Sequence, residues 1–147
     1  CYIKKIYKLM NIEKKIKFYK ENLGCFEETM DKYKYLLDQG KKAKLFPEEY
    51  RQDNFKIQGC QAQVWLIPKY DNIKLNFYSD SDAFITKGMI TILVDIYGNN
   101  TPSEILKSDF NLLNTLSLDT ILTSVRRNGV YSMLKKINEY AKHFKNK

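Results

Sequence analysis

The stretch VWLIPKYDNIKLNFY, residues 64–78, decides the fold class of this sequence. Its first four residues form a short apolar, β-favouring run that we expect Pro68 to end, and residues 69–72 have the composition of a turn. From Ile73 to Tyr78, apolar and polar side chains alternate, which is typical of a strand with one buried face. The stretch therefore predicts an antiparallel hairpin, and residues 80–85 are a candidate for a further short strand.

Helical patterns precede the hairpin. Residues 2–20 and 26–38 place apolar side chains at helical spacing, and Gly40 is predicted to cap the second of these helices. The polar stretch 41–54 is expected to be a loop. The first helix is strongly basic, so residues 1–20 are interpreted as a basic helical extension.

Helical patterns also follow the hairpin. Residues 86–97 are apolar around most of the helical circumference, which is typical of a helix in the core. Thr101 as N-cap and Pro102 at the first position predict the start of another helix. A long helix ends the chain, with apolar residues recurring from Val130. The predicted fold class is α+β, a two-layer domain with a small antiparallel sheet packed against helices, and residues 1–147 are expected to form one domain.

The charge of the chain is concentrated at its two ends. The formal net charge is +8, with +6 in residues 1–20, +4 in residues 131–147 and −2 in the remainder. A nucleic-acid-binding domain normally concentrates Lys and Arg on its working face. Lys outnumbers Arg 22 to 3, which is typical of an AT-rich genome. We therefore expect no nucleic-acid partner; docking of nucleic acid by the terminal helices stays as a third hypothesis, testable by salt titration.

Apolar runs are short throughout. The longest one without charge, residues 88–94, is far below the roughly 20 residues that span a bilayer. No secretory segment follows the basic start. We expect no membrane partner.

Few side chains are available for metal binding or for a catalytic triad. The three cysteines, Cys1, Cys25 and Cys60, are far apart in sequence, so metal-ligand spacing is absent. Their odd number argues against a closed disulfide framework and fits a reducing compartment. His143 is the one histidine and lies near a Lys-rich end, so hydrolase chemistry is not expected. Neither a metal nor a cofactor is predicted for this chain.

Cys60 is the cysteine with the most informative surroundings. Gly59 precedes it, which indicates a turn that needs a permissive backbone or close access. Two interpretations remain open on local composition: a small buried hydrophobic residue, or an accessible thiol nucleophile. Cys25, which precedes Phe26 at the expected start of a helix, fits the buried interpretation better.

Four motifs in order give the sequence a resemblance to the SufE family of sulfur-acceptor proteins. They are GCQAQVWL (59–66), DSDAFITKG (80–88), YGNNTPSEIL (97–106) and LTSVRRNGV (122–130), and the resemblance covers about residues 27–142. Two positions depart from the family pattern. Ala62 stands where the family has Ser, and Ser124-Val125 stands where it has Pro-Ser or Pro-Thr, so Thr123 or Ser124 is expected to cap the last helix.

The resemblance implies a SufE/IscU-like fold and a concrete function. Family members take persulfide sulfur from a cysteine desulfurase that carries pyridoxal phosphate, stimulate it, and pass the sulfur toward an iron–sulfur cluster scaffold. Cys60 matches the acceptor cysteine. The implied partners are a SufS-like desulfurase and a SufB-like scaffold, with a homodimer as a further possibility. The chain would be a persulfide carrier and desulfurase activator without turnover of its own.

Four further residues are assigned supporting or partner-binding roles. Gly59 and Gln61 flank Cys60. Asp82 is expected to shape the turn from strand to helix or to contact a partner. Arg126 matches an arginine of the family motif at the start of the last helix, where it lowers the thiol pKa, holds the Cys60 loop, or lies on the surface.

The alternative function is an IscU-like scaffold that binds nascent iron–sulfur clusters. It is the weaker hypothesis because only one cysteine lies in the motif. A bacterial cytoplasm is the expected location, and a plastid-type organelle is the alternative.

Shielding of the acceptor thiol is the last expectation. A persulfide is easily reduced or oxidised in bulk water. We therefore expect Cys60 to be mostly covered, with its sulfur facing an apolar hollow between residues 64–67 and the last helix, and with a raised pKa.

Overall fold

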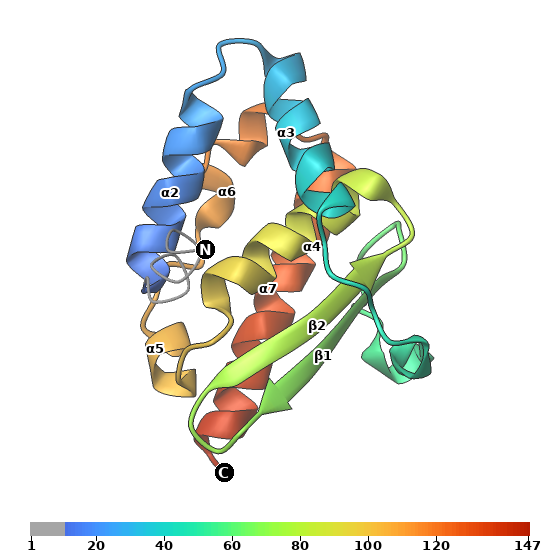
Figure 1. Ribbon diagram of the computed structural model, residues 1–147, viewed down its shortest axis with the longest axis vertical. Helices are drawn as coiled ribbons and strands as arrows, with labels where there is room; N and C mark the ends of the chain where they lie inside the picture. Colours follow the sequence, from blue (N-terminus) through green and yellow to red (C-terminus); the bar gives the residue numbers. More distant parts are fainter. Residues whose placement is uncertain (1–10) are drawn as a thin grey trace.

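A two-stranded hairpin lies across a set of helices in the computed structural model, which describes residues 11–147 (Figure 1). The helices are α2 (Ile12–Gly24), α3 (Thr29–Lys41), α4 (Phe84–Tyr97), α5 (Pro102–Leu106), α6 (Leu112–Thr115) and α7 (Ser124–Lys145), the strands are β1 (Val64–Tyr70) and β2 (Leu75–Ser81), and the 3-10 turns are η1 (Glu48–Tyr50), η2 (Asp53–Phe55) and η3 (Leu118–Thr120). The sheet forms one layer and the helices the other, so the predicted α+β class is confirmed.

The hairpin is the predicted one, with longer strands. β1 pairs with β2 antiparallel, from Val64 opposite Ser81 to Tyr70 opposite Leu75. The turn is closed by the Asp71 carboxylate, which accepts the backbone N–H groups of Ile73 and Lys74 at 2.9 and 2.7 Å.

Pro68 does not end the first strand, contrary to the prediction. Ile57 donates its N–H to the Val64 carbonyl, so the backbone groups of Val64 point away from β2. Backbone direction alternates along a strand pair, so Pro68 points the same way and its missing N–H costs no hydrogen bond to β2. The strand therefore continues to Tyr70.

The candidate third strand in residues 80–85 is wrong. β2 takes residues 80 and 81, and α4 begins at Phe84, two residues before the predicted start. Between them the Ser81 hydroxyl accepts the Ala83 N–H at 3.3 Å. The alternation of the hairpin strand therefore continues to Ser81 and then changes directly to helical periodicity.

α4 is the buried centre of the molecule, as its all-round apolar pattern predicts. Ile90, Leu93 and Ile96 are fully buried, and α3, α7 and β2 all pack against this helix.

The helix α5 begins as predicted: the Thr101 hydroxyl accepts the Glu104 N–H, and Pro102 is at the first helical position. Likewise Thr123 caps α7 by accepting the Arg126 N–H.

Gly40 does not cap α3. It lies inside the helix, which runs to Lys41, and a Cβ at this position would be 2.9 Å from the Phe84 carbonyl oxygen. Gly88 of α4 is tighter still, because its Cβ would be 2.0 Å from the Leu36 carbonyl oxygen. These two glycines therefore permit a close crossing of α3 and α4.

The N-terminal predictions have mixed outcomes. The predicted helix 2–20 overlaps α2 only in part, since residues 1–10 lie outside the described residues. Cys25 follows the end of α2 and is exposed, so its assignment as a buried residue at a helix start was wrong. Within residues 11–147, no helix is long and apolar enough to cross a membrane.

Candidate functional site

Cys60 lies on a short loop that is closed at its base. Ile57 donates its N–H to the Val64 carbonyl at 2.8 Å. Residues 58–63 therefore project from the start of β1 as one closed turn, called here the Cys60 loop. At its far end the Asp82 carboxylate accepts both the backbone N–H and the side-chain amide of Gln63, at 3.0 and 3.1 Å. Asp82 thus holds the exit of the Cys60 loop.

Gly59 adopts the conformation that its place before Cys60 predicts. Its φ is +89°, in a region that residues with a Cβ rarely adopt. A Cβ at this position would also be 2.5 Å from the Ser132 hydroxyl of α7. Both the backbone turn and the close approach to α7 therefore require glycine here.

The Cys60 thiol rests on the backbone of α7. The side chain is half-buried, and Sγ donates to the Gly129 carbonyl at 3.5 Å. A Cβ on Gly129 would be 3.7 Å from Sγ, an ordinary contact, so Gly129 lies directly beside the thiol. Gly59 thus allows the loop to seat the sulfur against α7 next to Gly129.

A cavity of about 330 Å³ opens beside the thiol, between the Cys60 loop, the first turns of α4 and the N-terminal half of α7. Its apolar lining includes Ile85, Met89 and Val130, and its polar lining comprises Gln61, Asp82, Thr86 and Arg126. Four of the five predicted site residues therefore line one hollow, and the fifth, Gly59, lies in the loop beside it.

One wall of the cavity differs from the prediction, which placed the hollow between residues 64–67 and the last helix. Residues 64–67 of β1 do not line it, because α4 takes that side of the cavity. The expectation that the last helix forms the other wall is correct. Sequence periodicity predicts both helices but not that their N-terminal turns meet at Cys60.

Burial raises the pKa of the Cys60 thiol above its ordinary value, as expected for a covered thiol. Desolvation disfavours the thiolate, which is the form that attacks sulfur. The free protein therefore holds Cys60 mainly as the less reactive thiol at neutral pH.

Arg126 does not hold the Cys60 loop. Its guanidinium donates to the Thr86 hydroxyl at 3.2 Å and so joins α7 to α4 across the cavity. This places a positive charge in the cavity wall, bound to a neutral partner. Gln61 is exposed at the cavity edge.

Three residues of the site were not assigned a role from the sequence: Gln63, Gly129 and Ser132. Gly129 carried a detectable signal, since a glycine inside a helix costs about 1 kcal/mol and indicates a close approach. Gln63 and Ser132 carry no such signal, because their contacts join segments far apart in the chain. Among residues 11–147, no three His, Cys, Asp or Glu side chains lie close enough to hold a metal ion.

Comparison with known structures identifies the fold. The solution structure of a hypothetical protein from Thermus thermophilus matches with a TM-score of 0.75 over 90% of this chain and 97% of that chain, at 16% sequence identity. At this identity the match shows the fold alone. The fold and the site thus define an α+β domain with one half-buried cysteine on a loop over a helix.

Sequence comparison identifies the family. The model of the SufE family, an Fe–S metabolism associated domain, matches residues 18–141. The cysteine desulfuration protein SufE of Wigglesworthia glossinidia brevipalpis is 38% identical over 88% of this chain and 90% of its own length. An uncharacterised SufE-like protein of Rhizobium etli is 37% identical over 79% of this chain and 82% of its own length. This chain belongs to the SufE family.

Proposed function

We propose that this protein is a sulfur acceptor that takes persulfide sulfur from a cysteine desulfurase onto Cys60. The observation that carries the proposal is the position of Cys60 itself, in the family motif and on a glycine-bounded loop beside a cavity. The name of the Wigglesworthia relative, a cysteine desulfuration protein, supports the same chemistry.

The transfer is a thiolate exchange. The Cys60 thiolate attacks the outer sulfur of the desulfurase's cysteine persulfide, a new S–S bond forms on Cys60, and the desulfurase cysteine leaves as a thiolate. Cys60 then carries the persulfide. The pyridoxal phosphate that generates the sulfur stays on the desulfurase, so this chain supplies only the nucleophile and its surroundings.

The covered thiol implies that docking must expose Cys60. Hydrogen bonds hold its loop mainly at the two ends: Ile57 to Val64 at the entry and Gln63 with Asp82 at the exit, where two bonds reach the Asp82 carboxylate and the Asp82 N–H donates to the Gln63 carbonyl. Between the ends, the hydrogen bond from the loop to α7 is the one from the thiol to Gly129. Opening therefore needs the loss of the thiol bond while the two ends of the loop can stay in place. Acceptance of sulfur in this way regenerates the desulfurase and stimulates its turnover.

The later fate of the sulfur is part of the proposal. The chain would pass it to a cluster assembly scaffold in a bacterial cytoplasm. The description of the family, an Fe–S metabolism associated domain, supports a role in this metabolism.

Mass spectrometry after incubation with a SufS-like desulfurase and cysteine tests the proposal. We expect a gain of one sulfur atom on the peptide that contains Cys60, together with faster release of alanine. Cys60→Ser should abolish both. Cys25→Ser, a matched change of an exposed cysteine, should leave both intact. Sulfur gain that persists in Cys60→Ser would overturn the assignment.

The alternative scaffold function is tested separately. Anaerobic reconstitution with iron and sulfide would give a coloured protein if the chain binds a cluster. A colourless protein rejects this alternative.

A further inference from the structure

A group of ion pairs and aromatic contacts fastens a second segment to the hairpin, away from the Cys60 cavity. This segment, the strap, is residues 42–56; it leaves the end of α3 and passes over the hairpin (Figure 1). Its Phe46 ring lies 6.5 Å from the Trp65 ring, and its Tyr50 ring stacks on Tyr78 at 5.7 Å. The strap, which the sequence predicted only as a loop, therefore packs on the hairpin face opposite the core.

Arg51 is the central contact of the strap. Its guanidinium carbon lies 5.2 Å from the centre of the Phe46 ring and 5.0 Å from that of the Trp65 ring. Both distances are in the range of cation–π contacts. The same guanidinium forms ion pairs with Glu48 of the strap and with Asp80 of β2. One side chain thus joins the strap to both hairpin strands.

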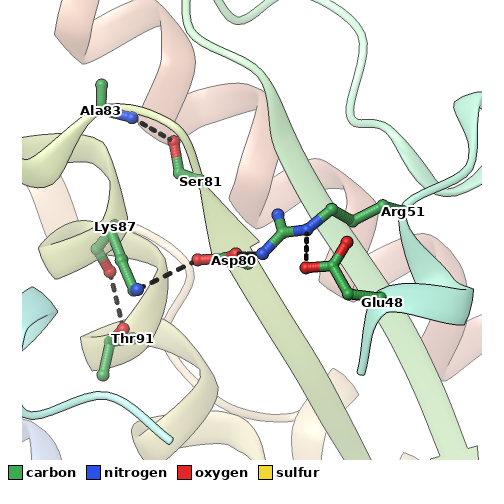
Figure 2. Close-up of polar contacts among 7 residues, drawn as sticks. All are labelled: Glu48, Arg51, Asp80, Ser81, Ala83, Lys87 and Thr91. Atoms are coloured by element: carbon green, nitrogen blue, oxygen red, sulfur yellow. Dashed lines mark hydrogen bonds and ion pairs between the residues drawn. The ribbon is translucent and has the colours of Figure 1, made fainter. Parts of the chain in front are cut away.

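Asp80 is the buried partner in this cluster. Figure 2 shows its carboxylate between Arg51 and Lys87, with Glu48 on the far side of Arg51. The Asp80 side chain is only 6% exposed, and Lys87 Nζ lies 3.3 Å from its carboxylate. Burial disfavours its charge, but Arg51, the Ser81 backbone N–H and Lys87 together outweigh that effect and hold the Asp80 pKa below its ordinary value.

The cluster connects to Cys60 in two directions. Along the chain, the strap ends at Lys56, which pairs with Trp65, and Ile57 then closes the Cys60 loop. Through space, Lys87 lies in the first turns of α4, where Ile85 and Thr86 line the Cys60 cavity. Asp80 therefore joins the segment that leads into the Cys60 loop to the helix that forms the cavity wall.

We propose that Arg51 is a positioning residue for Cys60: by fastening the strap to Asp80, it holds the Cys60 loop closed over its cavity. Arg51 is not a catalytic residue, since its contacts are with the strap and hairpin. The functional meaning rests on the proposed function, because Cys60 must open to accept sulfur. Removing Arg51 takes away the central contact of the strap and leaves the buried Asp80 carboxylate with one cation instead of two.

The rate of Cys60 alkylation in the free protein tests this proposal. The full chain is treated with iodoacetamide, and Cys60 and the exposed Cys25 are quantified in the same sample. We expect Arg51→Gln to raise the Cys60 rate relative to Cys25 about three- to tenfold, because the loop opens more often. Arg51→Lys, which keeps the charge without the planar guanidinium, should give an intermediate rate.

Two control variants separate positioning from general stability. Glu48→Gln removes the exposed ion-pair partner of Arg51, whose side chain is 80% exposed, and should leave the Cys60 rate unchanged. Tyr97→Phe removes the hydrogen bond to the Asp109 carbonyl at the C-terminal end of α4, at the opposite end of that helix from Ile85 and Thr86 in the Cys60 cavity. It should lower the melting temperature without raising the Cys60 rate.

The outcomes are distinct. An unchanged Cys60 rate in Arg51→Gln, or an equal rise in Tyr97→Phe, would overturn the proposal. If Arg51→Gln does not fold, Phe46→Leu removes one of the two rings that the Arg51 guanidinium contacts and keeps every charge. A smaller rise is expected, and no rise would overturn the proposal. No desulfurase is present in these measurements, so their failure is distinguishable from failure of the sulfur-acceptor function.

Discussion

The crossing of α3 with α4 and the seat of Cys60 on α7 each contain a pair of glycines, but they differ in what the glycines touch. At the crossing, Gly40 and Gly88 face backbone atoms of the opposite helix. At the site, Gly59 faces the Ser132 side chain and Gly129 faces the Cys60 sulfur. Helix backbones cannot yield, whereas a serine hydroxyl and a loop thiol can. The comparison indicates that the crossing of α3 and α4 is a fixed framework, whereas the contact of the Cys60 loop with α7, its seat, is able to open.

The strongest test of this comparison is Gly88→Ala. Its Cβ would be 2.0 Å from the Leu36 carbonyl oxygen, so α3 and α4 must separate. We expect a loss of about 3 kcal/mol or more in the free energy of unfolding, because the contact is with backbone on both sides. Urea denaturation measures this loss. A loss below that of Gly59→Ala would contradict the distinction between framework and seat.

Gly59→Ala should have the next largest effect. The φ of +89° costs a residue with a Cβ about 1–2 kcal/mol. The new methyl group also meets the Ser132 hydroxyl, so we expect the Cys60 loop to lift from α7 and its alkylation to become faster. Adding Ser132→Ala should restore part of the slow alkylation. Faster alkylation that Ser132→Ala leaves untouched would show that strain in the loop, and not contact with α7, is responsible.

The pH dependence of Cys60 alkylation should show an intermediate effect. Burial raises the thiol pKa, so less thiolate is present at neutral pH and the rate should rise to its plateau at higher pH than for a free thiol of pKa about 8.5. In Gly59→Ala, whose loop is lifted, the midpoint should move back toward that reference. A wild-type midpoint at or below the reference would contradict the covered seat.

Gly129→Ala should have the smallest effect. Its Cβ would be 3.7 Å from the Cys60 sulfur, an ordinary contact, and alanine favours the helix by about 1 kcal/mol or less. We expect a slight gain in stability, measured by urea denaturation, and somewhat slower alkylation because the thiol is better covered. A large loss of stability would show that the thiol seat is as rigid as the helix crossing.

Local sequence signals account for much of the fold. The hairpin follows from the apolar run at Val64 and the alternation after Ile73, and the start of α5 follows from Thr101 and Pro102. Each depends on side chains close together in sequence. Gly40 shows the limit of such signals: a glycine near a helix end resembles a cap, and only the position of α4 shows that it permits a crossing.

The candidate site could be predicted only in part. The resemblance to a family assigned Cys60, Asp82 and Arg126 to one site, and local composition alone could not have linked these three residues. The hydrogen bond from Arg126 to Thr86 and the cavity between α4 and α7 depend on how two helices meet, so their residues carry no local pattern. The prediction that Cys25 is buried was wrong for the same reason, because the exposure of a residue at the end of α2 depends on which other segments pack against it.

The proline in β1 has a consequence for how this protein behaves at high concentration. A two-stranded sheet has two edges, and an exposed edge can recruit strands from other molecules and start aggregation. On the outer edge of β1, Ile57 occupies the Val64 carbonyl, Tyr140 donates its hydroxyl to the Leu66 carbonyl, and Pro68 has no N–H to offer. At each of three successive outward positions, one of the two backbone groups that a neighbouring strand would use is therefore taken or missing. The edge next to the Cys60 loop is thereby a poorer template for intermolecular β-pairing.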